Sequence, residues 1–142
     1  MDSDTVLNKL ESLRRRVERV EAKTPEGLTE LLDDIDLQDI IVLNLERAVQ
    51  LCVDIGLQLV GELNLPVPAS MAEVFRVLAE SGVLQSENAD NLARAVGFRN
   101  TAVHAYQKID WSIVHAIATR HLDDFRVFAR SILKHLESQA PS

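Results

Sequence analysis

Apolar residues recur every three to four positions along almost the whole chain, which is the spacing of one face of an α-helix. No segment shows the strict alternation of apolar and polar residues, bounded by turn residues, that indicates a β-strand. The chain has 142 residues, enough for one domain with its own hydrophobic core. The sequence therefore predicts an all-α fold: a single helical domain over residues 1–142, built as an antiparallel bundle of four to five helices.

Two helical segments are delimited by their apolar stripes. The stripe of the first consists of Leu7, Leu10, Leu13, Val17 and Val20. A new helical run starts near Ile35, and the stretch Leu37 to Leu63 presents one apolar face over many turns. The members of that face are Ile40, Ile41, Leu45, Ala48, Cys52, Ile55, Leu59 and Leu63. Pro66 and Pro68 end this second helix.

Three further helices are marked by capping residues. Ser70 followed by Glu73 has the spacing of a capping box. Ser86 is the expected cap of the next helix, and Asp110 that of the final one, in which the apolar spacing continues unbroken. Gly97 permits either a kink or a local break in the helix before it.

Composition excludes several classes of protein. With 46% hydrophobic and 26% charged residues, the chain is too apolar for a disordered protein. No run of 18 uncharged apolar residues exists, and the N-terminus lacks the basic start and apolar centre of a signal peptide, so we expect no membrane contact and a cytoplasmic protein. Cys52, the single cysteine, is expected to be a small buried side chain. The net charge of −7 argues against coating by nucleic acid, so any RNA contact must be local.

One segment is basic in this acidic chain. From Asn91 to Ile109 there is no Asp or Glu, while Arg94, Arg99 and Lys108 give a local charge of +3 and leave −10 for the rest. We expect an anion to bind in this segment.

The same segment places a fixed cation, an amide, an imidazole and a phenol close together, in Arg99, Asn100, His104 and Tyr106. An imidazole moves protons near neutral pH, and a guanidinium donates two hydrogen bonds to phosphate oxygens. These groups fit metal-free cleavage of RNA, whose own 2′-hydroxyl is the nucleophile. The reaction needs both a base and an acid, and the segment offers one histidine, so a two-fold homodimer would supply the second.

Helix geometry leaves the assembly of this site open. Asn100 and His104 share a face, whereas Arg99 and His104 lie about 140° apart around a helix axis. The long arginine side chain could reach, Gly97 could distort the turn, or partner groups could come from another subunit. An Arg and a His five residues apart also occur by chance in many helices, and a lone tyrosine such as Tyr106 is often a boundary residue with its hydroxyl in water.

Other chemistry is not indicated. The remaining histidines, His115, His121 and His135, are separated by 6 and 14 positions, which does not match the spacing of a helical metal site. No glycine-rich phosphate loop or nucleophile elbow is present. We therefore expect no metal ion and no cofactor.

The motif segment, GFRNTAVHAYQKID, resembles the signature of the HEPN superfamily, which has an Arg, a polar residue, a short spacer and a His. The four-residue spacer and the tyrosine two positions after the histidine match its HepT-like branch. Three other segments resemble that branch in the same order: LQDIIVLNLERAVQLCVDIG, PVPASMAEVFRVLAESGVL and HLDDF. The resemblance covers the chain from about Leu37 to Phe128 and is less clear over the first 36 residues.

This resemblance implies a metal-independent ribonuclease toxin that works as a homodimer and is neutralised by a small MNT-type nucleotidyltransferase, its antitoxin. It assigns catalysis to Arg99 and His104, a supporting role to Asn100, and nucleotidylation by the antitoxin to Tyr106. The alternative is a non-catalytic dimeric binding partner, or the substrate-binding subunit of a nucleotidyltransferase, in which Arg99 and His104 hold nucleotide phosphate. The intact motif favours the nuclease.

Overall fold

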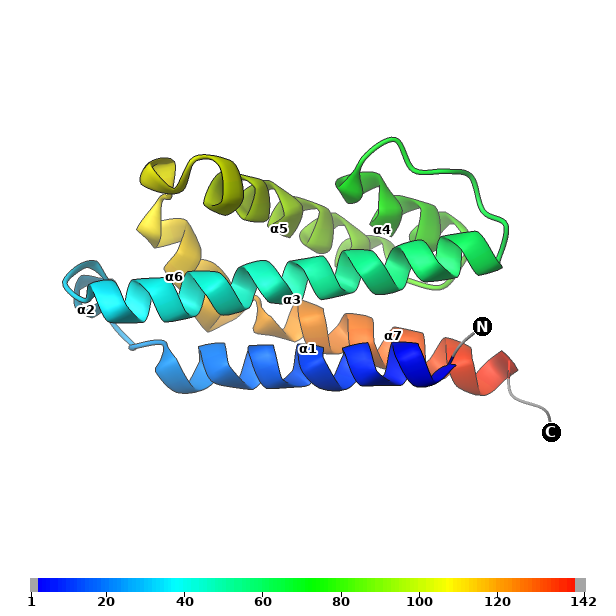
Figure 1. The fold of residues 1–142 in the computed structure, drawn as a ribbon, viewed down its shortest axis with the longest axis horizontal. Helices are drawn as coiled ribbons and strands as arrows, with labels where there is room; N and C mark the ends of the chain where they lie inside the picture. Colours follow the sequence, from blue (N-terminus) through cyan, green and yellow to red (C-terminus); the bar gives the residue numbers. More distant parts are fainter. Residues whose placement is uncertain (1–2, 140–142) are drawn as a thin grey trace.

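A computed structural model describes residues 3–139 of the chain, and within that range it contains seven α-helices, one 3₁₀ helix and no strand (Figure 1). The helices are α1 (Ser3–Lys23), α2 (Leu28–Leu32), α3 (Ile35–Glu62), α4 (Met71–Glu80), α5 (Ser86–His104), η1 (Tyr106–Lys108), α6 (Trp111–Arg120) and α7 (Leu122–Gln139). The expected all-α antiparallel bundle is confirmed.

The longest helix, α3, lies at the centre of the bundle. It packs against α1 on one side and against α4 and α5 on the other, and it also touches α7. Figure 1 shows α1 and α5 running in the direction opposite to α3 and α7. Within the described residues, none of the helices has the length and apolarity that crossing a membrane requires.

The apolar stripes form one continuous core along the bundle. In α1 the stripe differs by one position from the expected one, because Val6 is fully buried and Leu7 is 43% exposed. Val6 continues the alternating spacing of four and three set by Leu10, Leu13 and Val17, whereas Leu7 is displaced from it by about 100°. Elsewhere in the core, the rings of Phe75 and Phe128 meet edge to face at 6.0 Å.

Two of the three expected helix caps are confirmed. Ser70 accepts a hydrogen bond from the backbone N–H of Glu73 at 3.3 Å, and Asp110 accepts one from Ser112 at 2.9 Å. The third expectation is wrong, because Ser86 is the first residue of α5 and Gln85 occupies the cap position without a side-chain bond.

The expected final helix is two helices, α6 and α7, separated at His121. The break turns the chain so that α6 packs against α2 while α7 packs against α1, two contacts in different parts of the bundle. The five-residue α2 was not expected, and it buries Leu31 completely. In contrast, α5 continues through Gly97 as an unbroken helix.

Candidate active site at the end of α5

The motif lies across the C-terminal end of α5. Arg99, Asn100 and His104 belong to the helix, which ends at His104, and Ala105 leaves the helical conformation with φ −150° and ψ 56°. Tyr106 then begins the separate turn η1. The motif therefore does not follow one helical path to its tyrosine, and the side chain of Tyr106 is placed by η1 instead of by the helix.

Arg99 is held in place without being neutralised. Its Nη1 donates a 3.2 Å hydrogen bond to Oδ1 of Asn100 and lies 3.9 Å from the sulfur of Met71, the first residue of α4. Its Nε is buried and has no hydrogen-bond partner. None of the carboxylates in residues 3–139 is paired with this guanidinium, so its charge is available to an anion.

The imidazole of His104 is exposed at the last position of α5, and no residue in the described range makes a hydrogen bond with it. Because α5 is regular from Gly97 onward, a distorted turn does not bring Arg99 and His104 together. They stay about 140° apart around the helix axis. The two remaining alternatives are the reach of the long arginine side chain and a contribution from a second subunit.

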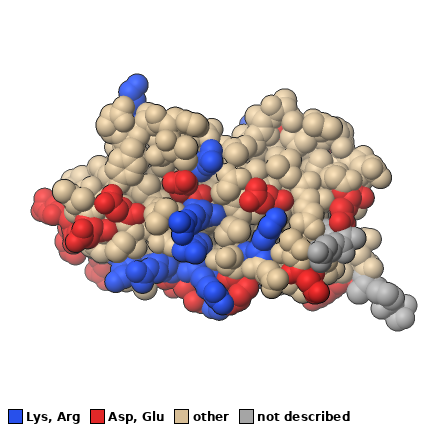
Figure 2. Space-filling model, in the orientation of Figure 1, with Lys and Arg blue, Asp and Glu red and all other residues tan. Residues whose placement is uncertain are grey.

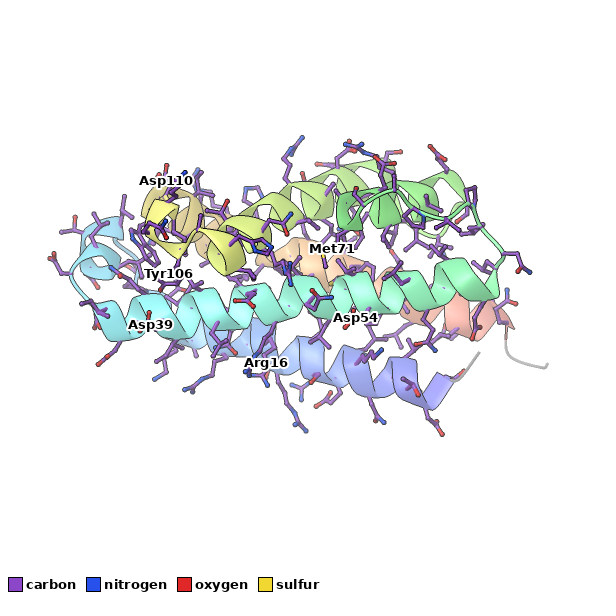
Figure 3. The ribbon with its side chains drawn as sticks, turned by 45° about the horizontal axis from the view of Figure 1, so that its top comes forward. Arg16, Asp39, Asp54, Met71, Tyr106 and Asp110 are labelled. Carbon is purple, nitrogen blue, oxygen red and sulfur yellow. The ribbon has the colours of Figure 1, made fainter. Side chains whose placement is uncertain are left out.

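Tyr106 contacts a residue far away in the sequence. Its hydroxyl donates a 2.7 Å hydrogen bond to Oδ1 of Asp39, 67 positions earlier on α3, and the two side chains meet near the start of α3 (Figure 3). The ring also packs edge to face against Trp111 at 6.1 Å. Partial burial, followed by the hydrogen bond and the charge of Asp39, raises the pKa of Tyr106 to about 12. The hydroxyl is therefore not simply hydrated, although the side chain is 41% exposed.

The acid-free segment does not form one anion site. Arg94 and Lys108 line a cavity of about 520 Å³ between α5, α6 and α7, and Arg99 does not line it. The cavity has a mostly apolar wall, and Asp110 and Asp124 also line it. A stretch without acidic residues in the sequence is thus bordered by carboxylates in the fold, and its three cations are divided between two surfaces.

The arginines of α1 differ in their partners. Arg14 pairs with Glu18 at 2.6 Å and also with Glu11, whereas Arg16 donates only to the amide of Asn44 on α3, at 3.2 Å. Arg19 and Arg47 make no ion pair with any residue between 3 and 139. We call the set Arg16, Arg19 and Arg47 the arginine row. Figure 2 shows Lys and Arg side chains gathered over the lower part of the face that is turned to the viewer, where α1 runs, with Asp and Glu on either side.

Cys52 and His115, two side chains outside the motif, lie in structural environments. Cys52 is fully buried, as expected, and burial raises the pKa of its thiol. His115 makes a 2.9 Å hydrogen bond with the backbone oxygen of Pro25. Among the described residues, no group of three or more His, Cys, Asp and Glu side chains is placed to hold a metal ion.

The fold and the motif define an all-helical protein of the ribonuclease type found in the HEPN superfamily. Residues 9–132 match the family described as Ribonuclease HepT-like, and the chain belongs to that family. It is 33% identical over 126 residues to the mRNA nuclease HepT of Shewanella oneidensis, a match that covers 89% of this chain and 94% of the relative.

Solved structures agree with this assignment. A HEPN toxin of Shewanella oneidensis, tri-AMPylated and in complex with its MNT antitoxin, superposes with a TM-score of 0.87 at 33% identity, over 94% of this chain and 99% of that one. A chain from a toxin–antitoxin crystal structure with AMP-PNP has the same TM-score at 32% identity, over 92% and 98%. The cytosolic protein YutE of Bacillus subtilis shares the fold at 15% identity and a TM-score of 0.87, over 100% and 96%.

Proposed function

We propose that this chain is an RNA endonuclease and the toxin of a toxin–antitoxin pair. The observation that carries the proposal is the end of α5, where an unneutralised guanidinium and an exposed imidazole lie five residues apart in a member of the Ribonuclease HepT-like family. The relative from Shewanella oneidensis is named an mRNA nuclease, which supports RNA as the substrate.

The proposed reaction uses groups of the protein and the RNA, without a metal ion. The 2′-hydroxyl attacks the adjacent phosphorus, a cyclic phosphate forms on the upstream fragment, and the 5′-oxygen of the downstream fragment leaves with a proton. Arg99 binds the phosphate oxygens, where charge builds up as the nucleophile attacks. His104 transfers a proton to or from an oxygen of the reacting group. Asn100 holds the guanidinium in position through the contact at 3.2 Å.

We propose that the active form is a homodimer whose two-fold axis passes near the segment from Arg99 to Tyr106. One chain offers one motif imidazole, while the reaction needs an acid and a base, so two copies of His104 in one cleft would complete the site. Light scattering should show a dimer at micromolar concentration. An excess of His104→Ala chains should depress the activity of the parent beyond simple dilution, because mixed dimers would lack one histidine. An active monomer would refute this arrangement.

The arginine row extends the proposed substrate contact away from the cleaved bond. Arg19 lies one turn beyond Arg16 on α1, and Arg47 one turn beyond Asn44 on α3. Because α1 and α3 run in opposite directions, these two residues flank Arg16 on opposite sides. RNA phosphates are the expected partners of these cations, which carboxylates of the described chain leave unpaired.

The proposed partner is an MNT-type nucleotidyltransferase, which silences the nuclease by attaching nucleotides to Tyr106. The tri-AMPylated toxin in complex with its MNT antitoxin supports this proposal. Tyr106 is the only tyrosine of the chain and is 41% exposed, so an enzyme can reach it. Its backbone is two residues from His104, so each added phosphodiester brings negative charge close to the site that binds RNA phosphate.

One experiment tests the central proposal. Purified protein is incubated with RNA in the presence of a chelator, and the ends of the fragments are analysed. Cleavage that leaves a cyclic phosphate upstream, and that disappears in a folded His104→Ala variant, would support the nuclease. Binding of RNA or nucleotide without cleavage under any condition would favour a non-catalytic binding partner instead.

A further inference from the structure

We propose that Asp39 is the base that accepts the proton of Tyr106 when the tyrosine is nucleotidylated. The modified protein would then supply a catalytic group for its own modification, while the nucleotidyltransferase supplies the nucleotide. This inference rests on the proposed function, because it needs Tyr106 to be the modified residue.

The geometry required for this proton transfer exists in the free chain. The hydroxyl donates directly to Oδ1 of Asp39 at 2.7 Å. This distance lies within the range of roughly 2.6–3.2 Å over which a general base accepts a proton. Asp39 has no cation and no second donor among residues 3–139, so its carboxylate is not engaged elsewhere. The edge-to-face contact with Trp111 fixes the ring, and the exposed part of Tyr106 leaves a side open for a nucleotide.

The state of the phenol explains why a base is needed. With a pKa of about 12, only about one Tyr106 hydroxyl in 10⁵ is ionised at pH 7. A neutral phenol is a weak nucleophile toward phosphorus, and it becomes a stronger one as its proton moves to an acceptor during the attack. Asp39 is the acceptor already bonded to that proton. Aspartate plays the corresponding part when protein kinases phosphorylate a hydroxyl group.

The step balances without a further reactant. The Oη atom of Tyr106 attacks the α-phosphorus of a nucleoside triphosphate, a phosphorus–oxygen bond forms, and the bond to the β-phosphate oxygen breaks. Pyrophosphate leaves with the electrons of that bond, and the phenolic proton passes to Oδ1 of Asp39. The resulting carboxylic acid is neutral, which removes its repulsion of the phosphate during the transfer, and it later loses the proton to water.

The test compares three variants of the full chain in the presence of an MNT-type nucleotidyltransferase, adenosine triphosphate and magnesium. Asp39→Asn keeps a carbonyl acceptor for the hydroxyl but removes the base. Asp36→Asn makes the same change of charge one turn earlier on α3, at an exposed position. Tyr106→Phe verifies the site of modification. Intact-mass spectra give the rate at which the first nucleotide is added, at several pH values.

Asp39→Asn should slow the first addition by about 10²- to 10⁴-fold, the usual contribution of a general base, while Asp36→Asn stays within about twofold. The residual rate of Asp39→Asn should rise about tenfold for each pH unit, because hydroxide must then remove the proton, and the rate of the parent should rise less steeply. A residue that only positions the hydroxyl would leave Asp39→Asn close to the parent with the same pH profile.

The two levels of the proposal fail in different ways. If the parent gains nucleotide mass on Tyr106 and Asp39→Asn gains it at the same rate with the same pH profile, the role of Asp39 is wrong and the modification site stands. If the parent gains no mass, or if Tyr106→Phe gains it equally well, the proposed modification of Tyr106 is wrong and the inference about Asp39 is overturned with it.

Discussion

Nη1 of Arg99 donates a 3.2 Å hydrogen bond to Oδ1 of Asn100, the next residue in the motif. A carbonyl oxygen orients a guanidinium without cancelling its charge, so the arginine keeps its attraction for a phosphate. From spacing alone, Asn100 belongs to the face of His104, and in the structure its oxygen acts on the arginine instead. Asn100, the polar residue of the motif, therefore orients the guanidinium of Arg99.

Arg99→Ala and His104→Ala should each reduce RNA cleavage by at least about 10²-fold, because one removes the phosphate ligand and the other the proton-transfer group. The melting temperature should change little. The side chain of His104 is exposed, and the buried Nε of Arg99 makes no hydrogen bond that the substitution would remove. Gel-based cleavage assays and circular dichroism melts check both points. Arg94→Ala, which changes a cation on the opposite surface of α5, is the control. A folded His104→Ala protein with parental activity would contradict the assigned role.

Cleavage should survive removal of divalent ions by a chelator, because the 2′-hydroxyl is the proposed nucleophile and Arg99 the proposed ligand of the phosphate. Analysis of the fragment ends should find a cyclic phosphate on the upstream product. Activity that is lost in the chelator and restored by a divalent ion would argue for metal-dependent chemistry.

The contact between Tyr106 and Asp39 should make stability fall at alkaline pH. The neutral phenol is the hydrogen-bond donor, and its pKa is raised from 10 to about 12 in the folded protein. The stability that burial of the neutral phenol and its bond to Asp39 contribute is therefore complete below about pH 10 and is lost as the pH rises through about 12. Tyr106→Phe should show a smaller loss over this range in denaturant titrations. Equal losses in parent and variant would mean that other groups cause the alkaline unfolding.

The single tyrosine permits a direct spectroscopic check of the same contact. Absorbance of the tyrosinate ion should develop at lower pH in Asp39→Asn than in the parent, because the charge and acceptor of Asp39 help to raise the pKa of Tyr106. Part of the shift should persist in the variant, since burial is its largest cause.

Gly56→Ala should destabilise the fold by about 1–3 kcal/mol, because it overpacks the contact between α3 and α4. A Cβ atom at Gly56 would lie 2.5 Å from Cγ1 of Val74. Gly97→Ala is the matched control, since that position in α5 is helical and has open space, and it should stabilise by roughly 0.5–1 kcal/mol. Urea unfolding gives both values. A neutral Gly56→Ala variant would show that α4 can move away from α3 without cost.

Replacing the arginine row by glutamine should weaken RNA binding most at low salt. For single-stranded RNA, the slope of log K against log salt should fall by about 0.7 for each phosphate contact that is lost. The comparison is made in a His104→Ala background so that the RNA stays intact. Arg14→Gln, whose parent side chain is paired with Glu11 and Glu18, should leave the slope unchanged. An unchanged slope in the triple variant would exclude the row from the RNA contact.

Local patterns in the sequence predicted the helical class, most of the core and two caps. Ser70 and Asp110 act through backbone groups two or three residues away, so their roles are visible in the sequence. The break at His121 has a weaker local signal, the acidic pair Asp123 and Asp124 in the first turn of α7, which is typical of a helix start. The apolar spacing continues across His121, so the sequence pattern predicted one helix there instead of two.

The partners of the candidate site could not be predicted in this way. Asp39 lies 67 positions before Tyr106, and the contact of Arg99 with Met71 joins residues 28 positions apart. Helical periodicity assigns each residue to a face of its own helix but does not say which residue of another helix will lie opposite. Arg94 and Lys108 line a cavity that Arg99 does not line, and this separation likewise depends on where α6 packs.

Because α5 ends at His104, Tyr106 lies outside the helices that form the buried core. The turn η1 that follows has no buried residue, and the hydrogen bond from Tyr106 to Asp39 joins it to α3 at the surface. The proposed nucleotidylation of Tyr106 would convert the donor hydroxyl into an ester oxygen and place a phosphodiester beside a carboxylate, so this surface contact would be lost while the buried helices keep their packing. A chain silenced in this way would stay folded, and hydrolysis of the bond to Tyr106 would return it to activity without refolding.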